Sequence, residues 1–448
     1  MLGLSLGLKP GGGAAALVPM PAGIGWDLAR FPLEIVKAGG KYRAQVAPRD
    51  LVDPGIWTGA AIHVDGVSGD DARSGLGAAD GDFTQAKRSI HAAFVAGNAT
   101  GAAYRVIVKA GQYEESAFSR NGNEEPTQPV AILGWGGSVR YRTGPFSVSW
   151  SDAGATHSAG IGSVRRVFRT DQRTAQGLYV ELAQAADLAA CQGTGNCWFA
   201  DGGTLHVNIG RAPGSGGIAV IRSFHGARFL THARDLYLED IHCEGGITGA
   251  LHLDAVADRN VVGVNCSFRY SAPSNVNSPL DAVQIRRTNG LVAFFGCDGS
   301  GGADDGWSFH EDGHAGMHVV MQGCIGFGNG AFAASSCNGL TTHDGVRLID
   351  LNGAYGWSRN GTEVHCIQTT RSWLAGTQAT ARDIDGTCVA FKCSNQARMW
   401  LQDTVADAAG GAVQNFAIEA NGGSVFTRGH VALGGDVGLS SGGTVSSF

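Results

Sequence analysis

Residues 303–316, ADDGWSFHEDGHAG, concentrate the side chains that proteins use for acid–base chemistry and for metal binding. The acidic and imidazole residues of this stretch are Asp304, Asp305, His310, Glu311, Asp312 and His314. His310 and His314 are four residues apart, but Gly313 and Gly316 disfavour the helix that would bring both imidazoles onto one face. We therefore expect no zinc site of the HExxH kind, and no other metal ligand set is recognisable.

Related side chains recur at equivalent positions of three short segments, DAVQI (281–285), DGWSF (305–309) and NGLTT (338–342). Side chains alternate between the two faces of a strand, so the third residues, Val283, Trp307 and Leu340, are expected to point inward. The outward sixth positions, starting from the preceding segment GALHL, then form a column of Asp254, Arg286, His310 and His343. With strands about 4.8 Å apart, this column would line a groove roughly 15 Å long.

The first positions of these segments add acids to the same surface. They are Asp281, Asp305 and Asn338, with Asp304 beside Asp305 and Asp344 beside His343. Residues far apart in sequence would thus converge, as a site requires. We predict catalytic roles for Asp281, Asp304, Asp305, His310 and His343, and substrate binding by Asp254, Arg286, Glu311 and Asp344. Asp305 and Asp344 precede glycine, however, and suit a purely structural turn equally well.

These segments alternate with a second family of apolar runs. DLYLEDIHC, NVVGVNCSF, LVAFFGCDG and MHVVMQGCI end in cysteines spaced 23, 31 and 27 residues apart, and VRLIDLNGA follows in phase. Such periods are typical of repeat proteins. Two strand columns per period, joined by polar turns, predict an all-β fold, a right-handed parallel β-helix. The cysteines within the runs are expected to be small buried apolar residues rather than disulfide partners.

We expect the β-helix to span residues 56–430, after an N-terminal arm or adaptor (1–55) rich in Gly, Pro and Ala and before a C-terminal strand or tail (431–448). Asp82 as N-cap, with Gln85 three residues later and Gly97 as the stop, predicts one helix that caps the first coil. The strand YRVIVKAG (104–111) follows it. Cys191 and Cys197, in the loop CQGTGNC, are the only pair that suggests a local disulfide.

The composition agrees with a fold of many turns and short strands, since 70 of 448 residues are glycine and only 12 are proline. The net charge of −6, from 33 basic and 39 acidic residues, disfavours nucleic acid as a partner. The N-terminus carries no recognisable signal peptide, and no apolar run is long enough to insert into a membrane. A protein acting outside the cell would then leave by lysis or by a dedicated secretion apparatus.

The module VDGVSGDDARSGLG, the helix and VIVKAGQYEE resemble the N-terminal coil of pectate-lyase-superfamily β-helices. The glycine-rich arm without a signal peptide is similar to that of bacteriophage tailspike depolymerases. The resemblance implies a polysaccharide as partner, an extracellular or virion-associated location and a homotrimer. The order of one Asp, an Asp pair and a His is similar to that of polygalacturonase-type inverting glycosidases. TTHDG stands here instead of a glycine-flanked histidine, however, and no Arg-x-Lys follows.

Three functions fit these residues. In a glycoside hydrolase, Asp281 would be the general acid and Asp304 or Asp305 the base, with no cofactor required. In a polysaccharide lyase, Arg286 or a Ca²⁺ ion would neutralise a uronate carboxylate, and His310 or His343 would remove the neighbouring proton. In an adhesin or virion structural protein, the groove would only bind glycan. We place hydrolysis of a bacterial or acidic polysaccharide first.

Overall fold

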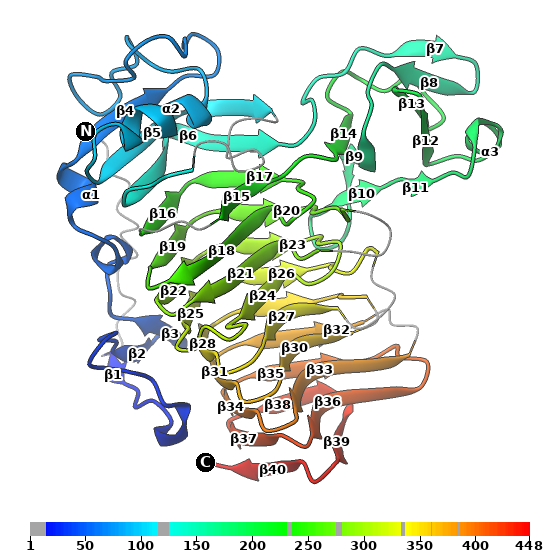
Figure 1. Cartoon of the computed structure of the whole chain (residues 1–448). Helices are drawn as coiled ribbons and strands as arrows, with labels where there is room; N and C mark the ends of the chain where they lie inside the picture. The colour runs from blue at the N-terminus through cyan, green and yellow to red at the C-terminus, as the bar shows by residue number, and fades with distance from the viewer. Residues whose placement is uncertain are drawn as a thin grey trace.

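The computed structural model describes residues 15–114, 125–230, 235–274, 280–332, 337–359, 361–382 and 386–448. Most of these residues form a right-handed parallel β-helix, whose successive turns stack from the N-terminal to the C-terminal end (Figure 1). The fold predicted from the sequence is therefore confirmed. Among the described residues, no helix is long and apolar enough to cross a membrane.

Three ladders of parallel strands make up the β-helix. The first comprises β4 (Ala60–Val64), the first halves of β5 (Tyr104–Glu114) and β6 (Val130–Arg142), then β16 (Leu236–Glu239), β19 (Val261–Val264), β22 (Leu291–Phe295), β25 (His318–Gln322), β28 (Arg347–Leu351), β31 (Arg371–Ala375), β34 (Arg398–Gln402), β37 (Ser424–Arg428) and β40 (Thr444–Ser447). The second comprises the remaining halves of β5 and β6, then β17 (Ile241–Glu244), β20 (Ser267–Arg269), β23 (Asp298–Ser300), β26 (Ile325–Phe327), β29 (Ala354–Gly356), β32 (Gln378–Ala381), β35 (Val405–Ala408) and β38 (Val431–Gly434).

The third ladder carries most of the predicted site. It comprises β15 (Ala227–Leu230), β18 (Leu251–Ala257), β21 (Val283–Thr288), β24 (Trp307–His310), β27 (Asn338–Thr342), β30 (Thr362–Cys366), β33 (Thr387–Ser394), β36 (Gln414–Asn421) and β39 (Asp436–Ser440). Val283, Trp307 and Leu340 are aligned on neighbouring strands and are at most 1% exposed, as the alternation predicts. They pack in the central core.

Two strand columns per turn were predicted, but from β15 onward the turns are built from three ladders of strands. The apolar runs bend at a single residue between the first and second ladders, for example at Asp240, Asn265 and Asn352, where φ is +59°, +50° and +54°. A one-residue left-handed bend leaves the apolar pattern on both sides intact, so the sequence reads as one strand. The backbone N–H of Asn265 donates to the carbonyl of Phe295 on the next turn, which stacks the bends (2.9 Å).

The described part of the N-terminal arm lies along the outer face of the first ladder (Figure 1). It contains β1 (Ala16–Leu17), η1 (Ala22–Ile24), β2 (Ile35–Ala38), β3 (Lys41–Ala44), η2 (Pro48–Leu51) and α1 (Gly55–Thr58). Trp26 and Ile35 of the arm belong to the same apolar cluster as Trp373 and Ile349 of the ladder. This cover explains why the runs of the first ladder are apolar on both faces. The attachment role of the arm stays a prediction.

The predicted helix is shorter than expected. Helix α2 spans Ile90–Asn98, and the Ser89 hydroxyl caps it by accepting from the N–H of Ala92 (3.1 Å). The prediction of Asp82 as N-cap was wrong, because its carboxylate accepts instead from the N–H groups of Ala78 and Thr84 in a local turn. Phe94 of α2 reaches the central core, but the capping function of the helix stays a prediction.

An antiparallel insertion between β6 and β15 was not predicted. It contains β7 (Ser151–Ala153), β8 (Thr156–Ala159), β9 (Val164–Arg173), β10 (Tyr179–Glu181), β11 (Ala183–Gln184), α3 (Leu188–Gly193), β12 (Cys197–Asp201), β13 (Thr204–Asn208) and β14 (Ile218–Arg222), and it projects sideways from the β-helix (Figure 1). Cys191 and Cys197 lie in it as free, buried thiols with their Sγ atoms 3.3 Å apart.

The ten cysteines are all free and buried, which confirms the interpretation of those within the apolar runs as core residues.

At the C-terminus, β38, β39 and β40 pair in parallel with β35, β36 and β37. Of the strand or tail expected here, residues 431–447 form strands that continue the ladders.

Candidate active site

A column of buried acids begins the third-ladder strands. Asp281, Asp305 and Asn338 stand two residues before the aligned core residues of β21, β24 and β27. The Asp281 Oδ1 atom accepts from the N–H of Asp305 (3.1 Å), and the Asp305 Oδ1 atom accepts from the N–H of Asn338 (2.7 Å). The side chains of Asp281 and Asp305 are only 5% and 7% exposed. Both acids are thus brought together as predicted, and both also fasten consecutive turns, a structural role that was not predicted.

Asp304 differs from its two neighbours in its hydrogen bonding. Its backbone N–H donates to the carbonyl of Leu280 (3.2 Å), while its Oδ1 atom is buried and has no hydrogen-bond partner in the described structure. An orphaned buried oxygen is costly in an inert position and is typical of a group that binds water or a ligand. Of the three carboxyls, Asp304 is therefore the one best placed to act on another molecule.

The three carboxyl groups retain protons more strongly than ordinary acids. Burial, followed by repulsion from Asp304, raises the pKa of Asp281 to about 7. Burial raises the pKa of Asp304 to about 6. Burial and then the charges of Asp281 and Asp304 raise the pKa of Asp305 well above its usual range. Because adjacent carboxylates in a low dielectric cannot all ionise, the group holds at least one proton near neutral pH.

The predicted outward column is also present. Asp254, Arg286 and His310 are aligned across β18, β21 and β24, and the ring of His310 stacks on that of His343 with centroids 4.1 Å apart. Burial lowers the pKa of both histidines, and that of His343 falls to about 4 with repulsion from His310 as a second cause. Both imidazoles are therefore neutral near pH 7. The groove predicted over this column stays a prediction.

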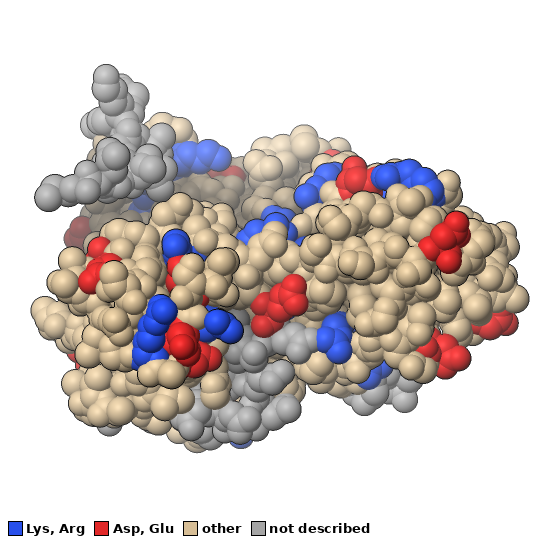
Figure 2. Space-filling model, turned by 90° about the horizontal axis from the view of Figure 1, so that it is seen from above, with Lys and Arg blue, Asp and Glu red and all other residues tan. Residues whose placement is uncertain are grey.

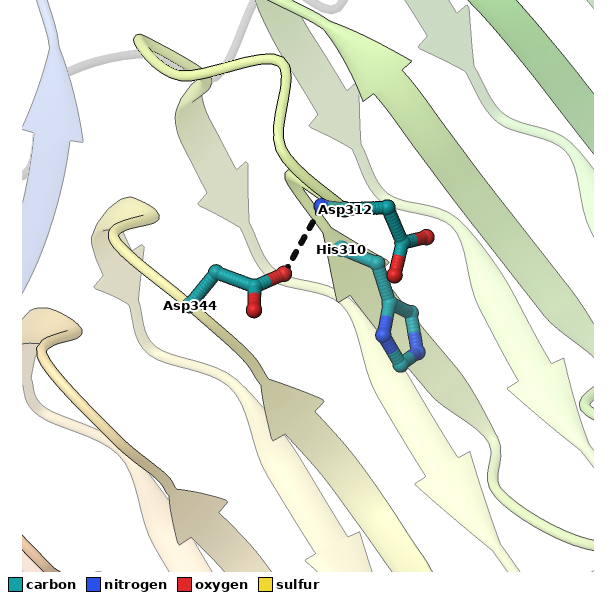
Figure 3. Close-up of side chains that lie close together, drawn as sticks. All are labelled: His310, Asp312 and Asp344. Atoms are coloured by element: carbon teal, nitrogen blue, oxygen red, sulfur yellow. Dashed lines mark hydrogen bonds between the residues drawn. The ribbon is translucent and has the colours of Figure 1, made fainter.

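The charged side chains Asp254 and Arg286 of this column form ion pairs with neighbouring residues. The Arg286 Nε atom lies 2.6 Å from Asp312 Oδ2, whereas Asp254 pairs with Arg287 at 2.6 Å. Asp344 Oδ2 accepts from the N–H of Asp312 (2.8 Å), as Figure 3 shows. Three of the predicted substrate-binding residues are therefore already engaged by Arg287 or Asp312, which were not predicted to belong to the site.

His310, Asp312 and Asp344 offer ligand atoms that lie within 4.8 Å of one another (Figure 3). Calcium prefers about six to eight oxygen ligands, and this set offers one imidazole nitrogen and two carboxylates. One of those carboxylates is already neutralised by Arg286. The donor set therefore does not fit calcium.

Glu311 was expected on the outward surface with the substrate-binding residues, but its carboxylate is buried. Glu311 is 6% exposed, and its Oε1 atom accepts from the N–H groups of Gly316 and Met317 (2.8 and 3.1 Å). The carboxylate closes the loop that follows β24, so residue 311 does not face solvent. Its carboxylate accepts hydrogen bonds from backbone N–H groups that have no strand partner.

The fourth positions of the same strands were not predicted to belong to the site. Gln284 and Ser308 are aligned and face outward between the acids and the histidines. The Gln284 amide donates to Asp281 Oδ2 (2.9 Å), and the Ser308 hydroxyl forms a hydrogen bond with His310 Nε2 (2.7 Å). The two-residue alternation that located the sixth positions applies equally to these. They orient one acid and one imidazole of the site.

No protein-family model matches this sequence, and no curated protein matches it. A solved structure named a glycoside hydrolase superposes with a TM-score of 0.51 at 10% identity, over 87% of this chain and 96% of that chain. A pectate lyase superposes with a TM-score of 0.36 at 14% identity, over 89% and 81% of the two chains. The tailspike of Acinetobacter baumannii bacteriophage AP22, in complex with A. baumannii capsular saccharide, gives 0.31 at 11%, over 80% and 69%. The likeness to the glycoside hydrolase shows only that the two chains share a fold, which in this protein is a parallel β-helix.

Proposed function

We propose that this protein hydrolyses glycosidic bonds of a bacterial or acidic polysaccharide. The observation that carries the proposal is the group of three carboxyls, Asp281, Asp304 and Asp305, whose pKa values are raised by burial and mutual repulsion. Glycoside hydrolysis requires one carboxyl that keeps its proton near neutral pH and a second that accepts one. This group provides both within two adjacent turns.

The environments of the carboxyls suggest their roles. Asp281, with the pKa of about 7, donates its proton to the glycosidic oxygen as the bond to the anomeric carbon breaks. Asp304, with its free Oδ1 atom, orients a water molecule and accepts its proton as the water oxygen bonds to that carbon. Asp305 accepts from both the backbone and the side-chain N–H of Asn338 (2.7 and 3.0 Å) and donates its own N–H to Asp281, so it positions Asp281.

Elimination from a uronate polymer is the second candidate. It is favoured by the neutral imidazoles of His310 and His343, since a neutral imidazole can remove a proton. It is disfavoured by the pairing of Arg286 with Asp312, because the guanidinium charge needed by the substrate carboxylate is already offset. Hydrolysis therefore ranks ahead of elimination.

The fold supports the proposal only in a general way. The solved structure that shares it is named a glycoside hydrolase, but one fold hosts many functions. The side chains of the three acids therefore carry the proposal. An extracellular or virion-associated location and a homotrimer remain part of the proposal as expectations from the sequence.

A panel of capsular and uronate polysaccharides tests the proposal. We expect new reducing ends without the ultraviolet absorbance of an unsaturated uronate. Asp281→Asn should lower the rate by about 100-fold or more, because general acid catalysis is lost. The exposed Asp436→Asn on β39 is the matched control and should keep wild-type activity. Absorbance that rises with the reducing ends would establish elimination, and binding without cleavage of any glycan would indicate an adhesin.

A further inference from the structure

A polar groove, termed the second groove after the second ladder on which it lies, occurs on another face of the β-helix than the predicted one. It has a volume of about 560 Å³, and its floor is the outer surface of the second ladder, from β6 through β17 and β20 to β23. Arg140, His242, Ser267, Arg269 and Asp298 line this floor. Its wall is the insertion, through Arg173 of β9 and Tyr179 of β10. The volume lies within the range of small-ligand sites.

Glu244, one of the two acids that line the groove, is fully neutralised. Glu244 accepts from Arg140 (3.0 Å) and Arg142 (2.7 Å), and the Tyr179 hydroxyl donates to it (3.3 Å). Burial alone would raise the pKa of Glu244, but the two guanidinium groups outweigh it and hold the pKa below its usual range. The charge of Glu244 therefore does not repel an anion from the groove.

The remaining charges leave the groove positive. Arg269 pairs with Asp298 through its Nε atom (2.7 Å). Among the residues that line the groove, the guanidinium groups of Arg140, Arg173 and Arg269 outnumber the two carboxylates by one positive charge. The buried Arg142, which pairs with Glu244, adds a second. On the face seen in Figure 2, basic and acidic groups form small mixed clusters on a mostly uncharged surface.

The guanidinium of Arg173 stacks on an aromatic ring in the wall of the groove. Its Cζ atom lies 4.0 Å from the centre of the Tyr179 ring, and that ring stacks on Tyr270 with centroids 5.1 Å apart. No ion pair of Arg173 occurs among the described residues. The stack fixes the guanidinium at the rim, where its forked N–H donors match a carboxylate.

We infer that this groove binds a carboxylate-bearing sugar of an acidic polysaccharide, separately from the carboxyl group of Asp281, Asp304 and Asp305. Arg173 binds the carboxylate, while Ser267 and His242, which hydrogen-bond to each other (3.0 Å), line the floor beneath the sugar hydroxyls. The inference rests on the proposed function, since it names the class of sugar on which that function would act. The groove retains the polymer while another part of it is at the carboxyls.

Titration of oligomers of galacturonate, glucuronate and mannuronate against the full chain tests this inference. Asp281→Asn protein is used so that cleavage does not consume them. We expect uronate oligomers to bind more tightly than their carboxyl-reduced neutral counterparts, with an affinity that falls as salt is added. Arg173→Gln should weaken binding by about 10-fold or more, which corresponds to the loss of a charge-assisted hydrogen bond. The matched control is Arg398→Gln, an exposed residue of β34, which should bind as the parent does.

Equal binding of acidic and neutral oligomers, no binding of any uronate oligomer, or unchanged binding by Arg173→Gln would overturn the inference. Arg173 is preferred to Arg269 for this test because removing Arg269 would leave the buried Asp298 without its partner. Binding that depends on Arg173 in a protein that cleaves no glycan would uphold the groove and refute the proposed hydrolysis. Cleavage without Arg173-dependent binding would refute the groove and uphold the hydrolysis.

Discussion

Asp281→Asn should change how the stability of the protein depends on pH. In the folded protein burial raises the pKa of Asp281 from 3.8 to about 7, so the folded state keeps the proton that the unfolded chain releases. Stability from this group is fully present below pH 3.8 and is lost as the pH rises toward about 7. The amide that replaces the carboxyl in the variant does not titrate, so the variant lacks this loss.

The size of the effect follows from the shift in pKa. A rise from 3.8 to about 7 corresponds to about 4 kcal/mol of unfolding free energy lost across that interval. The geometry tolerates the amide, since its oxygen can accept from the N–H of Asp305 and the Gln284 amide can turn its oxygen toward the new NH₂ group. We therefore expect the variant to be the more stable protein at neutral pH.

Denaturant unfolding of both proteins at several pH values across this interval measures the difference. Asp350 and Glu363 are buried acids whose pKa values are raised to about 7 and about 8, so some loss of stability with pH remains in the variant. The Asp436→Asn control should follow the wild type. Equal pH dependence of the wild type and Asp281→Asn would refute the reasoning, because Asp281 would then be ionised at neutral pH and could not be the general acid.

Three further predictions concern other parts of the molecule. Arg286→Gln should lower a hydrolytic rate by less than about 10-fold, because Asp312 already offsets the Arg286 charge; loss of all activity would indicate elimination. Asn352→Ala should lower the free energy of unfolding, measured in denaturant, by about 2–4 kcal/mol, because it removes two hydrogen bonds to the Tyr42 backbone and puts alanine at positive φ. Asn352→Gly should lower that free energy by less, and equal losses in the two variants would contradict the backbone contribution. EDTA should leave the rate unchanged and added Ca²⁺ should not raise it, because the donor set at His310 does not fit calcium; a calcium-dependent rate would be the contrary result.

The two-residue alternation of strands made one part of the site predictable. It placed Trp307 in the core and aligned Arg286 with His310, because the direction of a side chain on a strand depends only on its local position. The same rule predicted the stack of His310 on His343. The sequence therefore determined the fold class and the residues that face outward on the third ladder.

The pairing of the charged residues was not predictable in the same way. Glu311 gave no local sign that it would bind the N–H groups of Gly316 and Met317 rather than face solvent. The one-residue bends, such as Asp240, left no break in the apolar pattern, so the third strand of each turn was missed.

The sequence by itself determined a parallel β-helix with acids and histidines on one ladder, because strand periodicity is a local property of the chain. Only the tertiary structure decided which of those groups are charged and which are already paired. The pKa of Asp281 depends on burial and on the neighbouring Asp304. The second groove depends on contacts such as that of Arg142 with Glu244, residues 102 positions apart. Burial and long-range contact arise only when separate turns and the insertion pack together.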